Sequence, residues 1–391
     1  MQSKRIYFEC NALIADHFSG VGHYVKGIAQ AWDSYLGSPE HTILQKEKRV
    51  RYTTVLLASK NCLKRLVKYR LEHMPQRGTT LPAHILYKLD FFGLMPPLDL
   101  KFGRATYLFT NFTRFPVWRS KSATIIYDIT YEVVPQYSDK NLARYLSKVV
   151  RRAVKKSDLI ITISNHAKKE LVKFYDLQPD KVMVAYPAVN RRDFYRRSEW
   201  EIDKVKRKYE LPDNYVLFVG NIEPRKNITT LIESYTKLPL DLSKKYPLLL
   251  VGVNAWRNKA IFEKIEAAKK NGYNIVRPKT YVDDNDIPAV YSGASMLVYP
   301  SHYEGFGMPP LEAMSCGIPV ITADNSSLPE VVGNAGILIK STDEKGITSA
   351  MQKLMTDTPL RDSLIKKGYA QSRKFSWDKS AQKIYKALLE L

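Results

Sequence analysis

The sequence predicts an α/β protein with two doubly wound domains, each built on a parallel sheet covered by helices. Three observations support this prediction. Short apolar runs, typical of buried strands, alternate with helical stretches along the chain. The 391 residues are many for a single core and suit two domains of ordinary size. The segment 294–322 has the pattern strand, glycine-rich loop, short helix, strand, which is the unit from which such sheets are built.

The segment 294–322 has the clearest pattern in the chain. Ala294-Ser-Met-Leu-Val-Tyr-Pro300 indicates a short buried strand that ends at a proline, and Pro319-Val-Ile-Thr322 indicates another. Residues 311–316 between them have helical spacing, and Gly317 is a good helix stop. Such a unit places its loop and its helix N-terminus at the carboxyl edge of a parallel sheet, where ligands bind.

Two glutamates flank the glycine-rich loop of this segment. Glu304 precedes glycines that let the backbone approach a ligand closely, and Glu312 follows within the predicted helix. A carboxylate beside the loop can accept hydrogen bonds from sugar hydroxyls, and a second carboxylate can hold both hydroxyls of a ribose. Considered singly, each glutamate is also well described as a solvated surface residue.

The string Glu304-Gly-Phe-Gly-Met-Pro-Pro-Leu-Glu312 resembles the E-x7-E motif of family 4 glycosyltransferases, which are retaining enzymes that use nucleotide sugars. The resemblance implies the GT-B fold, in which two Rossmann-like domains face a central cleft. It also implies that Glu304 is a catalytic residue at the donor sugar and that Glu312 binds the nucleotide ribose. The residues that would line the donor sugar are Gly305, Phe306, Gly307 and Met308.

A second segment of the C-terminal half carries two adjacent cations. Arg225 and Lys226 lie at a predicted helix start, where side-chain charges add to backbone N–H groups and suit a diphosphate. The segment resembles the stretch that holds the donor phosphates in the same family, so we assign both residues to the donor diphosphate. Ordinary surface cations are the alternative. Asp283-Asp-Asn-Asp286 contains Asp-x-Asp, but it precedes a predicted helix that an Asp would cap, so we predict no metal site and no cofactor.

The N-terminal half holds two further candidate sites. Gly20 and Gly22 lie at a predicted strand-to-helix turn, and in the resembled family a similar loop faces the donor, so we assign both to the donor diphosphate. The predicted strand 122–128 ends in Tyr127-Asp128, where the family usually has His-Asp. We assign Asp128 as a catalytic group that faces the acceptor hydroxyl. A cap on the turn after the strand describes Asp128 equally well.

Composition sets the predicted domain limits and compartment. Residues 191–208 are charged without an apolar stripe, which predicts a linker between an N-terminal domain, 1–195, and a nucleotide-sugar domain, 205–374. The last helix, 375–391, resembles the family's C-terminal helix that crosses back onto the first domain. The chain has three scattered cysteines, no signal-peptide pattern and no apolar run near the roughly 20 residues of a membrane span. We therefore expect a cytoplasmic protein.

The net charge of +22 is unevenly distributed. Residues 1–200 hold 34 Lys and Arg against 17 Asp and Glu, or +17, whereas residues 201–391 hold 27 against 22, or +5. This imbalance indicates an anionic partner, which could be nucleic acid, a membrane surface or the donor phosphates, or else a solvated basic surface. A basic predicted helix at 61–74 and an aromatic stretch at 86–97 fit an interfacial membrane contact, and they also fit ordinary packing on a sheet.

The predicted function is the transfer of a hexose with retention of configuration from a nucleoside diphosphate sugar. By family likeness the sugar is mannose and the donor GDP-mannose. The expected acceptor is a glycan or a lipid-linked glycan in cell-surface polysaccharide synthesis, with the enzyme peripheral on an anionic membrane. No nucleic-acid module is recognisable, so we expect no nucleic-acid partner. Two other classes stay open: an inactive GT-B-like scaffold subunit, because of Tyr127, and a nucleic-acid-binding protein, because of charge alone.

Overall fold

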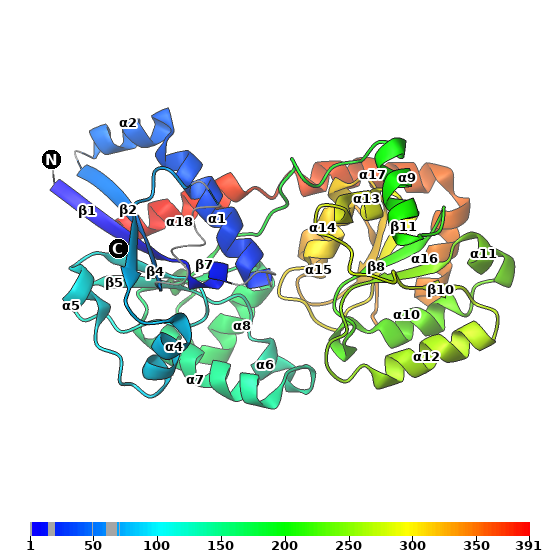
Figure 1. Ribbon diagram of the computed structural model, residues 1–391, viewed down its shortest axis with the longest axis horizontal. Coiled ribbons are helices and arrows are strands. Elements are labelled where there is room, and N and C mark those ends of the chain that lie inside the picture. Colours follow the sequence, from blue (N-terminus) through cyan, green and yellow to red (C-terminus); the bar gives the residue numbers. More distant parts are fainter. Residues whose placement is uncertain (1, 15–19, 49, 60–68, 70) are drawn as a thin grey trace. The chain divides into compact units, whose positions relative to one another are not determined.

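The computed structural model describes residues 2–14, 20–48, 50–59, 69 and 71–391 (Figure 1). Two predictions fall partly outside these residues. Residues 16–19, which lead into the predicted glycine loop, are outside them, and so are residues 61–68 and 70 of the predicted basic helix. Residues 71–74, the end of that predicted helix, have irregular backbone.

Contacts divide the chain into two compact units. Unit 1 comprises Met1–Pro187 and Ser376–Leu391, and unit 2 comprises Ala188–Phe375. The first boundary falls before the predicted domain end at 195, because residues 188–195 make their contacts within unit 2.

A helix, α9 (Glu199–Tyr209), occupies much of the predicted linker 191–208, so the linker prediction was wrong there. The helix begins with a capping box in which Ser198 and Glu201 satisfy each other's backbone N–H groups. It buries Ile202, Val205 and Tyr209 on one side. Three apolar positions are enough to dock a helix, but among so many charged residues they form no obvious stripe in the sequence.

The described part of unit 1 contains a parallel seven-stranded sheet in the order β3-β2-β1-β4-β5-β6-β7. The order reverses between β1 and β4, which makes this pair the switch point where ligands bind in open α/β sheets. The strands are β1 (Gln2–Glu9), β2 (Val50–Ser59), β3 (Gln76–Thr79), β4 (Thr106–Phe109), β5 (Lys121–Ile125), β6 (Leu159–Thr162) and β7 (Val182–Val184). The α-helices are α1 (Gly20–Leu36), α2 (Pro39–Glu47), α4 (Ala83–Phe91), α5 (Leu98–Phe102), α6 (Thr130–Val133), α7 (Lys140–Lys156), α8 (Asn165–Tyr175) and α18 (Trp377–Glu390). Short 3-10 turns are η1 (Asn11–Ile14), η3 (Pro135–Tyr137) and η4 (Pro179–Lys181).

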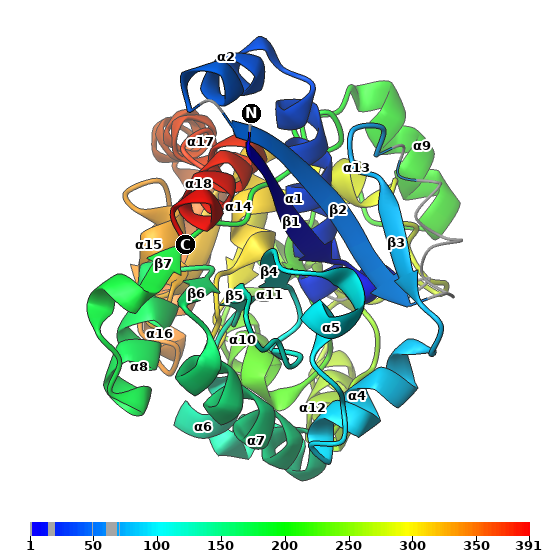
Figure 2. The ribbon, with the colours of Figure 1, turned by 90° about the vertical axis from the view of Figure 1, so that its left-hand side faces the viewer.

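Successive residues of β1 show why this sheet is covered on both faces. Tyr7 packs against Phe102 of α5 with ring centroids 5.7 Å apart, and the next residue, Phe8, packs against Trp32 of α1 at 5.3 Å. Adjacent side chains of a strand point to opposite faces, so α5 and α1 cover opposite sides of the sheet (Figure 2).

The C-terminal helix α18 packs on α1 within unit 1. Gly27 of α1 lies directly under the indole of Trp377, where a Cβ atom would overlap the ring. Tyr385 of α18 also contacts α2, where its Oη lies 2.8 Å from His41 Nε2. The missing side chain at Gly27 thus permits the close approach of the two helices. None of the helices in the described residues is long and apolar enough to cross a membrane.

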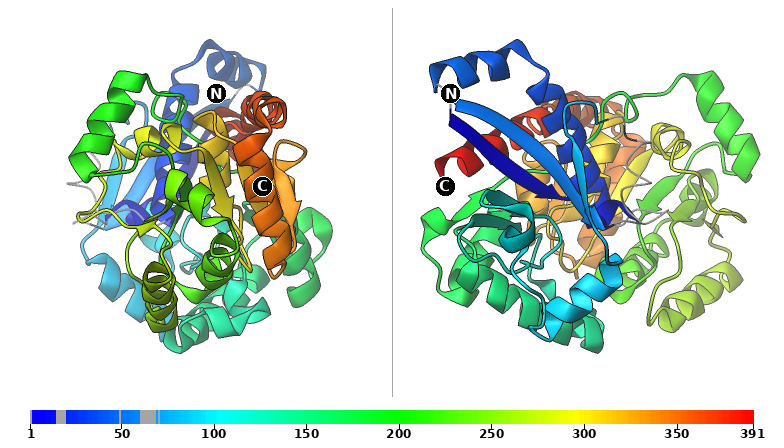
Figure 3. Two further views of the ribbon diagram at one scale, coloured as in Figure 1. Left: turned by 90° about the vertical axis from the view of Figure 1, so that its right-hand side faces the viewer. Right: turned by 60° about the vertical axis from the view of Figure 1, so that its left-hand side comes forward.

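Unit 2 contains a parallel six-stranded sheet in the order β10-β9-β8-β11-β12-β13, with helices on both sides (Figure 3). Its switch point lies between β8 and β11. The strands are β8 (Val216–Val219), β9 (Leu248–Val251), β10 (Ile275–Val276), β11 (Met296–Tyr299), β12 (Val320–Ala323) and β13 (Ile337–Ile339). The helices after α9 are η5 (Pro224–Lys226), α10 (Ile228–Tyr235), α11 (Leu240–Lys245), α12 (Lys259–Lys270), α13 (Ile287–Ser292), α14 (Met308–Ser315), α15 (Leu328–Val332), α16 (Glu344–Thr356) and α17 (Thr358–Ser372). Two Rossmann-like units with parallel sheets confirm the predicted fold class.

Candidate active site

The segment 294–322 folds as the sequence predicts, into β11, a loop, α14 and β12. Gly307 sits at the start of α14 with φ +110°, a conformation that L side chains rarely adopt, and a Cβ atom there would lie 2.7 Å from Leu328. Gly317 follows α14 with φ +74°, against the hydroxyl of Tyr369. Both glycines are therefore required by the backbone path that aims this loop.

Glu304 lies at the centre of a buried cluster of charges in unit 2. Its Oε1 accepts a hydrogen bond from Lys226 Nζ at 2.7 Å, and its Oε2 accepts one from Arg225 at 3.0 Å. A second carboxylate, Glu223, accepts from the other end of the Arg225 guanidinium at 2.8 Å. The structure thus brings together three of the predicted site residues, Arg225, Lys226 and Glu304.

Tyr299, the last residue of β11, joins this cluster through its hydroxyl. Lys226 Nζ donates to Tyr299 Oη at 2.5 Å, and Tyr299 Oη in turn donates to Glu304 Oε1 at 2.9 Å. The phenol is fully buried, with its ring stacked on Phe218 at 5.8 Å. Tyr299 therefore fixes the ammonium and the carboxylate relative to the sheet.

The electrostatics of the cluster favour fixed charges. Burial by itself raises the pKa of Glu304, but Arg225 and Lys226 outweigh this and lower it to about 2. Burial lowers the pKa of Lys226, and Glu304 opposes this by favouring the ammonium. Burial raises the pKa of Tyr299 well above 10, so its phenol stays protonated and continues to donate. Of the side chains in the two ion pairs, Arg225 is the most open to solvent, at 21%.

Hydrogen bonds between side chains and backbone groups hold the segments that carry the cluster. Asn227, which follows the two cations in a left-handed conformation, donates from its side chain to the carbonyl of Pro300 at 3.0 Å. On the other side, Ser327 Oγ donates to the carbonyls of Glu304 and Phe306 at 2.8 and 2.7 Å, and Ser326 Oγ accepts from the Glu304 N–H at 3.0 Å. The loop is therefore held from both sides.

The predicted sugar-binding residues differ in their surroundings. Gly305 and Gly307 are buried, and Met308 is half-buried. The Phe306 side chain is buried and packs edge-on against Phe375, with ring centroids 5.4 Å apart. Phe306 is thus anchored in the core of unit 2, and only the backbone of that residue can face a ligand.

Glu312 lies in the second turn of α14, apart from the ion pairs of Glu304. Its Oε2 accepts a hydrogen bond from Tyr291 Oη at 2.8 Å. Burial raises the pKa of Glu312 to about 7; the bond from Tyr291 opposes this rise, and nearby Asp284 adds to it. Near neutral pH this carboxyl is therefore divided between its neutral and charged forms.

The N-terminus of α14 has fewer donors than the sequence pattern suggests. Four N–H groups at a helix start normally lack a partner within the helix, but Pro309 and Pro310 occupy two of these positions and have no N–H group. Backbone donation to an anion here is limited to Gly307 and Met308. The side-chain cations consequently carry more of the charge that a phosphate would meet.

The predicted site residues of unit 1 have local roles in the structure. Gly20 opens α1, and Gly22 lies in its first turn, so the structure has helix where the sequence predicts a turn. Both hydrogen bonds that the described residues donate to Asp128 go to Oδ1, from Thr130 N at 3.0 Å and Thr130 Oγ1 at 2.7 Å. Asp128 therefore caps the turn that begins α6, which is the alternative the sequence left open.

Tyr127, which stands where the family usually has His, is an anchor of the unit 1 core. Its hydroxyl donates to the carbonyl of Thr110 at 2.7 Å, and its ring packs edge-on against Tyr24 at 5.3 Å. The side chain is 5% exposed. The structure therefore gives Tyr127 a packing role in the core of unit 1.

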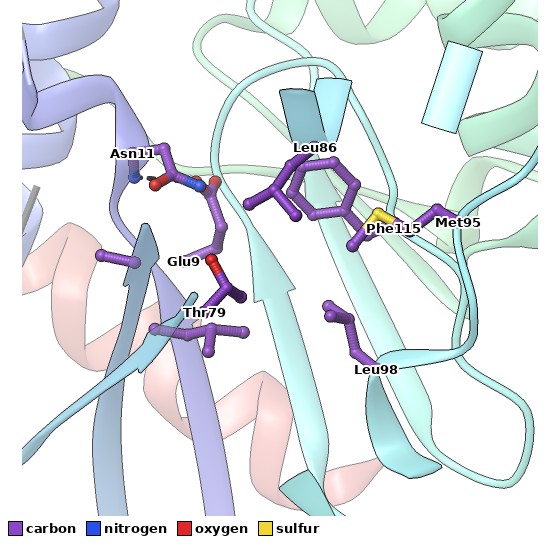
Figure 4. A pocket seen from close by; sticks show the side chains of 9 residues that line it. Glu9, Asn11, Thr79, Leu86, Met95, Leu98 and Phe115 are labelled. Atoms are coloured by element: carbon purple, nitrogen blue, oxygen red, sulfur yellow. Dashed lines mark hydrogen bonds between the residues drawn. The ribbon is translucent and has the colours of Figure 1, made fainter. Parts of the chain in front are cut away.

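A pocket in unit 1 lies at the carboxyl ends of β1, β2 and β3 (Figure 4). Its buried carboxylate, Glu9, accepts from Asn11 N at 2.7 Å and from Thr110 N and Oγ1 at 3.2 and 3.0 Å, and burial raises its pKa. These bonds tie β1 to β4 at the switch point. The lining residues are Glu9, Asn11, Leu57, Ala58, Thr79, Leu86, Met95, Leu98 and Phe115.

Four polar residues of these sites were missed in the sequence. They are Glu9, Glu223, Tyr291 and Tyr299. Tyr291 lies in a helix and Tyr299 ends a strand, and in both places an aromatic residue is typical of ordinary core packing. Glu223, two residues before Arg225, was the best available signal, because a carboxylate next to paired cations predicts an ion pair.

Asp286 was expected to cap α13, and it does not. It stands at the N-cap position, but its carboxylate accepts from Lys208 at 2.6 Å and from Tyr209 at 2.7 Å, which ties α9 to this turn. Among the described residues no group of three or more His, Cys, Asp or Glu side chains could hold a metal ion.

Two family models match the chain: Glycosyl transferases group 1 over residues 199–371 and Glycosyltransferase Family 4 over residues 90–193. The chain is 35% identical over 259 residues to O-antigen chain mannosyltransferase B of Escherichia coli. The matched region covers 66% of this chain and 67% of that protein.

Solved structures with the same fold extend over nearly the whole chain. Anabaena Alr3699/HepE, in complex with UDP and glucose, has a TM-score of 0.70 at 17% identity and covers 99% of both chains. WaaG, a glycosyltransferase involved in lipopolysaccharide biosynthesis, has a TM-score of 0.67 at 15% identity and covers 98% of this chain and 99% of that one. The motif around Glu304, the two family matches and this fold agree: the chain belongs to the family 4 glycosyltransferases of the GT-B fold and is a transferase.

Proposed function

We propose that the protein transfers mannose, with retention of configuration, from a nucleoside diphosphate sugar to a growing cell-surface glycan. The 35% identity to an O-antigen chain mannosyltransferase supports the sugar and the acceptor class. The observation that carries the reaction type is the buried cluster of Arg225, Lys226 and Glu304 at the carboxyl edge of the unit 2 sheet. GDP-mannose is the donor we expect.

In the proposed reaction the bond between sugar C1 and the diphosphate oxygen breaks, and the acceptor oxygen bonds to C1. The leaving diphosphate gains negative charge in the transition state, so cations next to it stabilise that state more than the ground state. Glu223 and Glu304 already hold the guanidinium of Arg225, and Tyr299 and Glu304 hold the ammonium of Lys226. Because these cations are fixed beforehand, little reorganisation is needed when the charge develops.

The acceptor hydroxyl must lose its proton during transfer. Asp128 is our proposed group on the acceptor side: its Oδ1 accepts both bonds from Thr130, and no described residue donates to Oδ2. In this role Oδ2 would face the acceptor hydroxyl. Gly20 and Gly22, in the first turn of α1, are proposed to face the donor diphosphate.

Glu312 is proposed to hold the ribose of the donor. An ionised carboxylate can accept from two neighbouring hydroxyls, whereas a protonated one has less acceptor capacity. Tyr291 already donates to one oxygen of Glu312, so a ribose would use the other oxygen or displace that bond.

We expect transfer to proceed without a bound metal. The proposal rests on Arg225 and Lys226, two cations that Glu223 and Glu304 hold at the proposed phosphate position. Chelator should therefore leave turnover unchanged.

The acceptor is proposed to be lipid-linked, which would make this a cytoplasmic enzyme that works peripherally at an anionic membrane. The +17 charge of residues 1–200 motivates this, and we expect no nucleic-acid partner. An inactive scaffold subunit is not favoured, because the relatives that the chain resembles are named as mannosyltransferases.

A thermal-shift screen with GDP, UDP, ADP and their sugars tests the donor. A donor present at 100 times its dissociation constant should stabilise the protein by about 2.7 kcal/mol, because it binds only the folded state. Arg225→Gln should remove most of this shift, whereas Lys237→Gln, which breaks an exposed pair with Glu344 elsewhere on unit 2, should not. Equal shifts in both variants, or no shift with any nucleotide sugar, would refute the assignment. NMR of the product's anomeric proton tests retention.

A further inference from the structure

Unit 1 exposes four large apolar side chains on neighbouring segments. Phe92 and Leu94 follow α4 and are 67% and 70% exposed, Leu100 on α5 is 65% exposed, and Trp118 is 67% exposed. Their neighbours in sequence, such as Met95, Leu98 and Phe102, are buried in the core of the unit. The segments are thus firmly anchored, while these four side chains remain in water.

The buried residues of these segments pack into one core cluster, which places the segments next to one another. The Leu94 N–H donates to the Leu89 carbonyl at 2.8 Å, which folds the loop back onto the end of α4. Asp99 of α5 accepts from the backbone N–H groups of Trp118 and Arg119 at 2.9 and 2.7 Å. Trp118 is therefore held next to α5, and the guanidinium of Arg119 lies over its ring, 4.8 Å from the ring centroid.

Helix α7, which contacts the end of α4, bears a row of cations. Lys140, Arg144, Lys148, Arg151 and Lys155 follow one another at steps of four, four, three and four residues, which places them within an arc of about 80° on the helix. Its sequence, KNLARYLSKVVRRAVKK, contains no acidic residue. Val149, Val150, Ala153 and Val154 are buried.

Three contacts join α7 to the end of α4 and to Phe92. Lys148 Nζ lies 4.0 Å from the ring centroid of Phe91, and Phe91 contacts Phe92 at 5.4 Å. Phe91 also stacks on Tyr145 of α7 at 5.6 Å. We name the surface formed by Phe92, Leu94, Leu100, Trp118 and the cations of α7 the basic–apolar face; α4, α5 and α7, from which it is built, are seen in Figure 2.

Acidic side chains next to the basic–apolar face are already engaged. Asp90 is buried and paired with Arg152, and Asp99 accepts the backbone bonds of Trp118 and Arg119. Glu132 lies 3.8 Å from Arg151, so one cation of the row has an acidic partner. The exposed charged side chains of residues 88–119 are all positive: Lys88, Lys101, Arg104 and Arg119. The face therefore presents cations and large apolar groups together.

We propose that the basic–apolar face docks onto an anionic phospholipid bilayer. Trp and Leu side chains enter the boundary between headgroups and acyl chains, while the cations of α7 meet the lipid phosphates. Charge argues against a second copy of this chain, since two such faces would repel each other. Nucleic acid would use the cations but would leave Leu94 and Leu100 without an apolar contact. The assignment rests on the proposed lipid-linked acceptor, which the docked unit 1 would meet at the membrane surface.

The first test follows Trp118 in the full chain. With vesicles of phosphatidylcholine and phosphatidylglycerol at 7:3, brominated on the acyl chains, we expect quenching of tryptophan fluorescence that Trp118→Phe removes. Trp200 is a matched control, because it is also 67% exposed and carries a lysine, Lys204, over its ring at 5.4 Å, but lies in unit 2. Trp200→Phe should leave the vesicle-dependent quenching intact. If both variants lose the quenching equally, or if the natural chain shows no quenching, the basic–apolar face does not contact the bilayer.

The second test measures vesicle partitioning by co-sedimentation. Arg144→Gln with Lys148→Gln should lower partitioning about 25-fold, since each cation near an anionic bilayer contributes about fivefold. The control pair Lys244→Gln with Lys270→Gln removes two exposed lysines of unit 2 and should change little. Leu94→Ser with Leu100→Ser should lower it about tenfold or more. Equal partitioning onto neutral vesicles refutes the role of charge, and equal loss in the unit 2 control refutes the location.

Further measurements separate this inference from the proposed reaction. Donor-induced thermal shifts and transfer to a short water-soluble acceptor should be the same for the face variants and the natural chain. If these fail for the natural chain while vesicle binding behaves as expected, the reaction is wrong and the face stands. Self-association without vesicles that the leucine variant abolishes, or salt-dependent binding to nucleic acid in place of vesicles, would overturn the bilayer as the partner.

Discussion

Replacing Glu304 by Gln is the most direct test of the charge cluster. The side chain keeps its size but loses its charge, so Arg225 keeps its ion pair with Glu223 and Lys226 loses its ion pair with Glu304. A fall in the Glu304 pKa from 4.5 to about 2 corresponds to about 3 kcal/mol of stabilisation by its ionised form. The carboxylate is 9% exposed, so solvent screens little of this energy. We expect unfolding free energy at pH 7 to fall by up to about 3 kcal/mol.

The stability lost in Glu304→Gln should depend on pH in a defined direction. A carboxyl whose pKa is lowered on folding stabilises the protein fully above its unfolded pKa of 4.5, and this contribution is lost as pH falls towards 2. By pH 3 about 2 of the 3 kcal/mol should be gone. The difference between natural protein and Glu304→Gln should therefore shrink markedly between pH 7 and pH 3.

Urea unfolding at both pH values measures the difference, and hydrogen exchange of peptides from β8 and β11 assigns it to unit 2. The control is Glu210→Gln, which breaks an exposed pair with Lys279 and should cost less than about 1 kcal/mol. Donor turnover should fall by about 100-fold or more in Glu304→Gln. A variant with full turnover, or with the same stability difference at both pH values, would show that these charges do not act as described. Glu304→Ala should unfold unit 2 more readily, because it also leaves a cavity.

Three further predictions concern neighbouring groups. The pKa of Glu312 near 7 implies that donor affinity, measured by calorimetry, rises between pH 6 and pH 8 as the carboxylate ionises; an equal rise in Glu312→Gln would contradict this. Tyr299→Phe keeps the ring stacking but removes the bonds to Lys226 and Glu304, so turnover should fall about tenfold. Because Glu304 loses a hydrogen-bond donor, the pH at which activity falls on the acid side should rise. If this pH is unchanged, Tyr299 does not act on Glu304. Gly307→Ala should destabilise unit 2 by about 1–3 kcal/mol in urea, because φ is +110° and the Cβ would crowd Leu328; stability equal to the natural protein would rule out that strain.

Local patterns were sufficient where a property depends on neighbours in the sequence. The strand, loop and helix around Glu304 were predicted because alternating apolar runs, two glycines and a helix stop lie within thirty residues. The assignment of Arg225 and Lys226 to the donor diphosphate followed from resemblance to a family, not from spacing alone. Helix α9 was missed because its buried face consists of only three residues among many charges.

The amino-acid sequence by itself determined the α/β class, the two parallel sheets and the position of the glycine-rich loop, because these depend on residue type and period. Only the tertiary structure decided which partner each charged group takes. Tyr299 and Lys226 are 73 residues apart in the chain and meet because β11 and β8 are adjacent in the sheet. In the same way, the sequence left open whether residues 86–97 pack on a sheet or meet a membrane, and only packing buried Met95 while it left Leu94 in water. Such contacts join residues that are far apart in the chain, and patterns among neighbouring residues therefore cannot predict them.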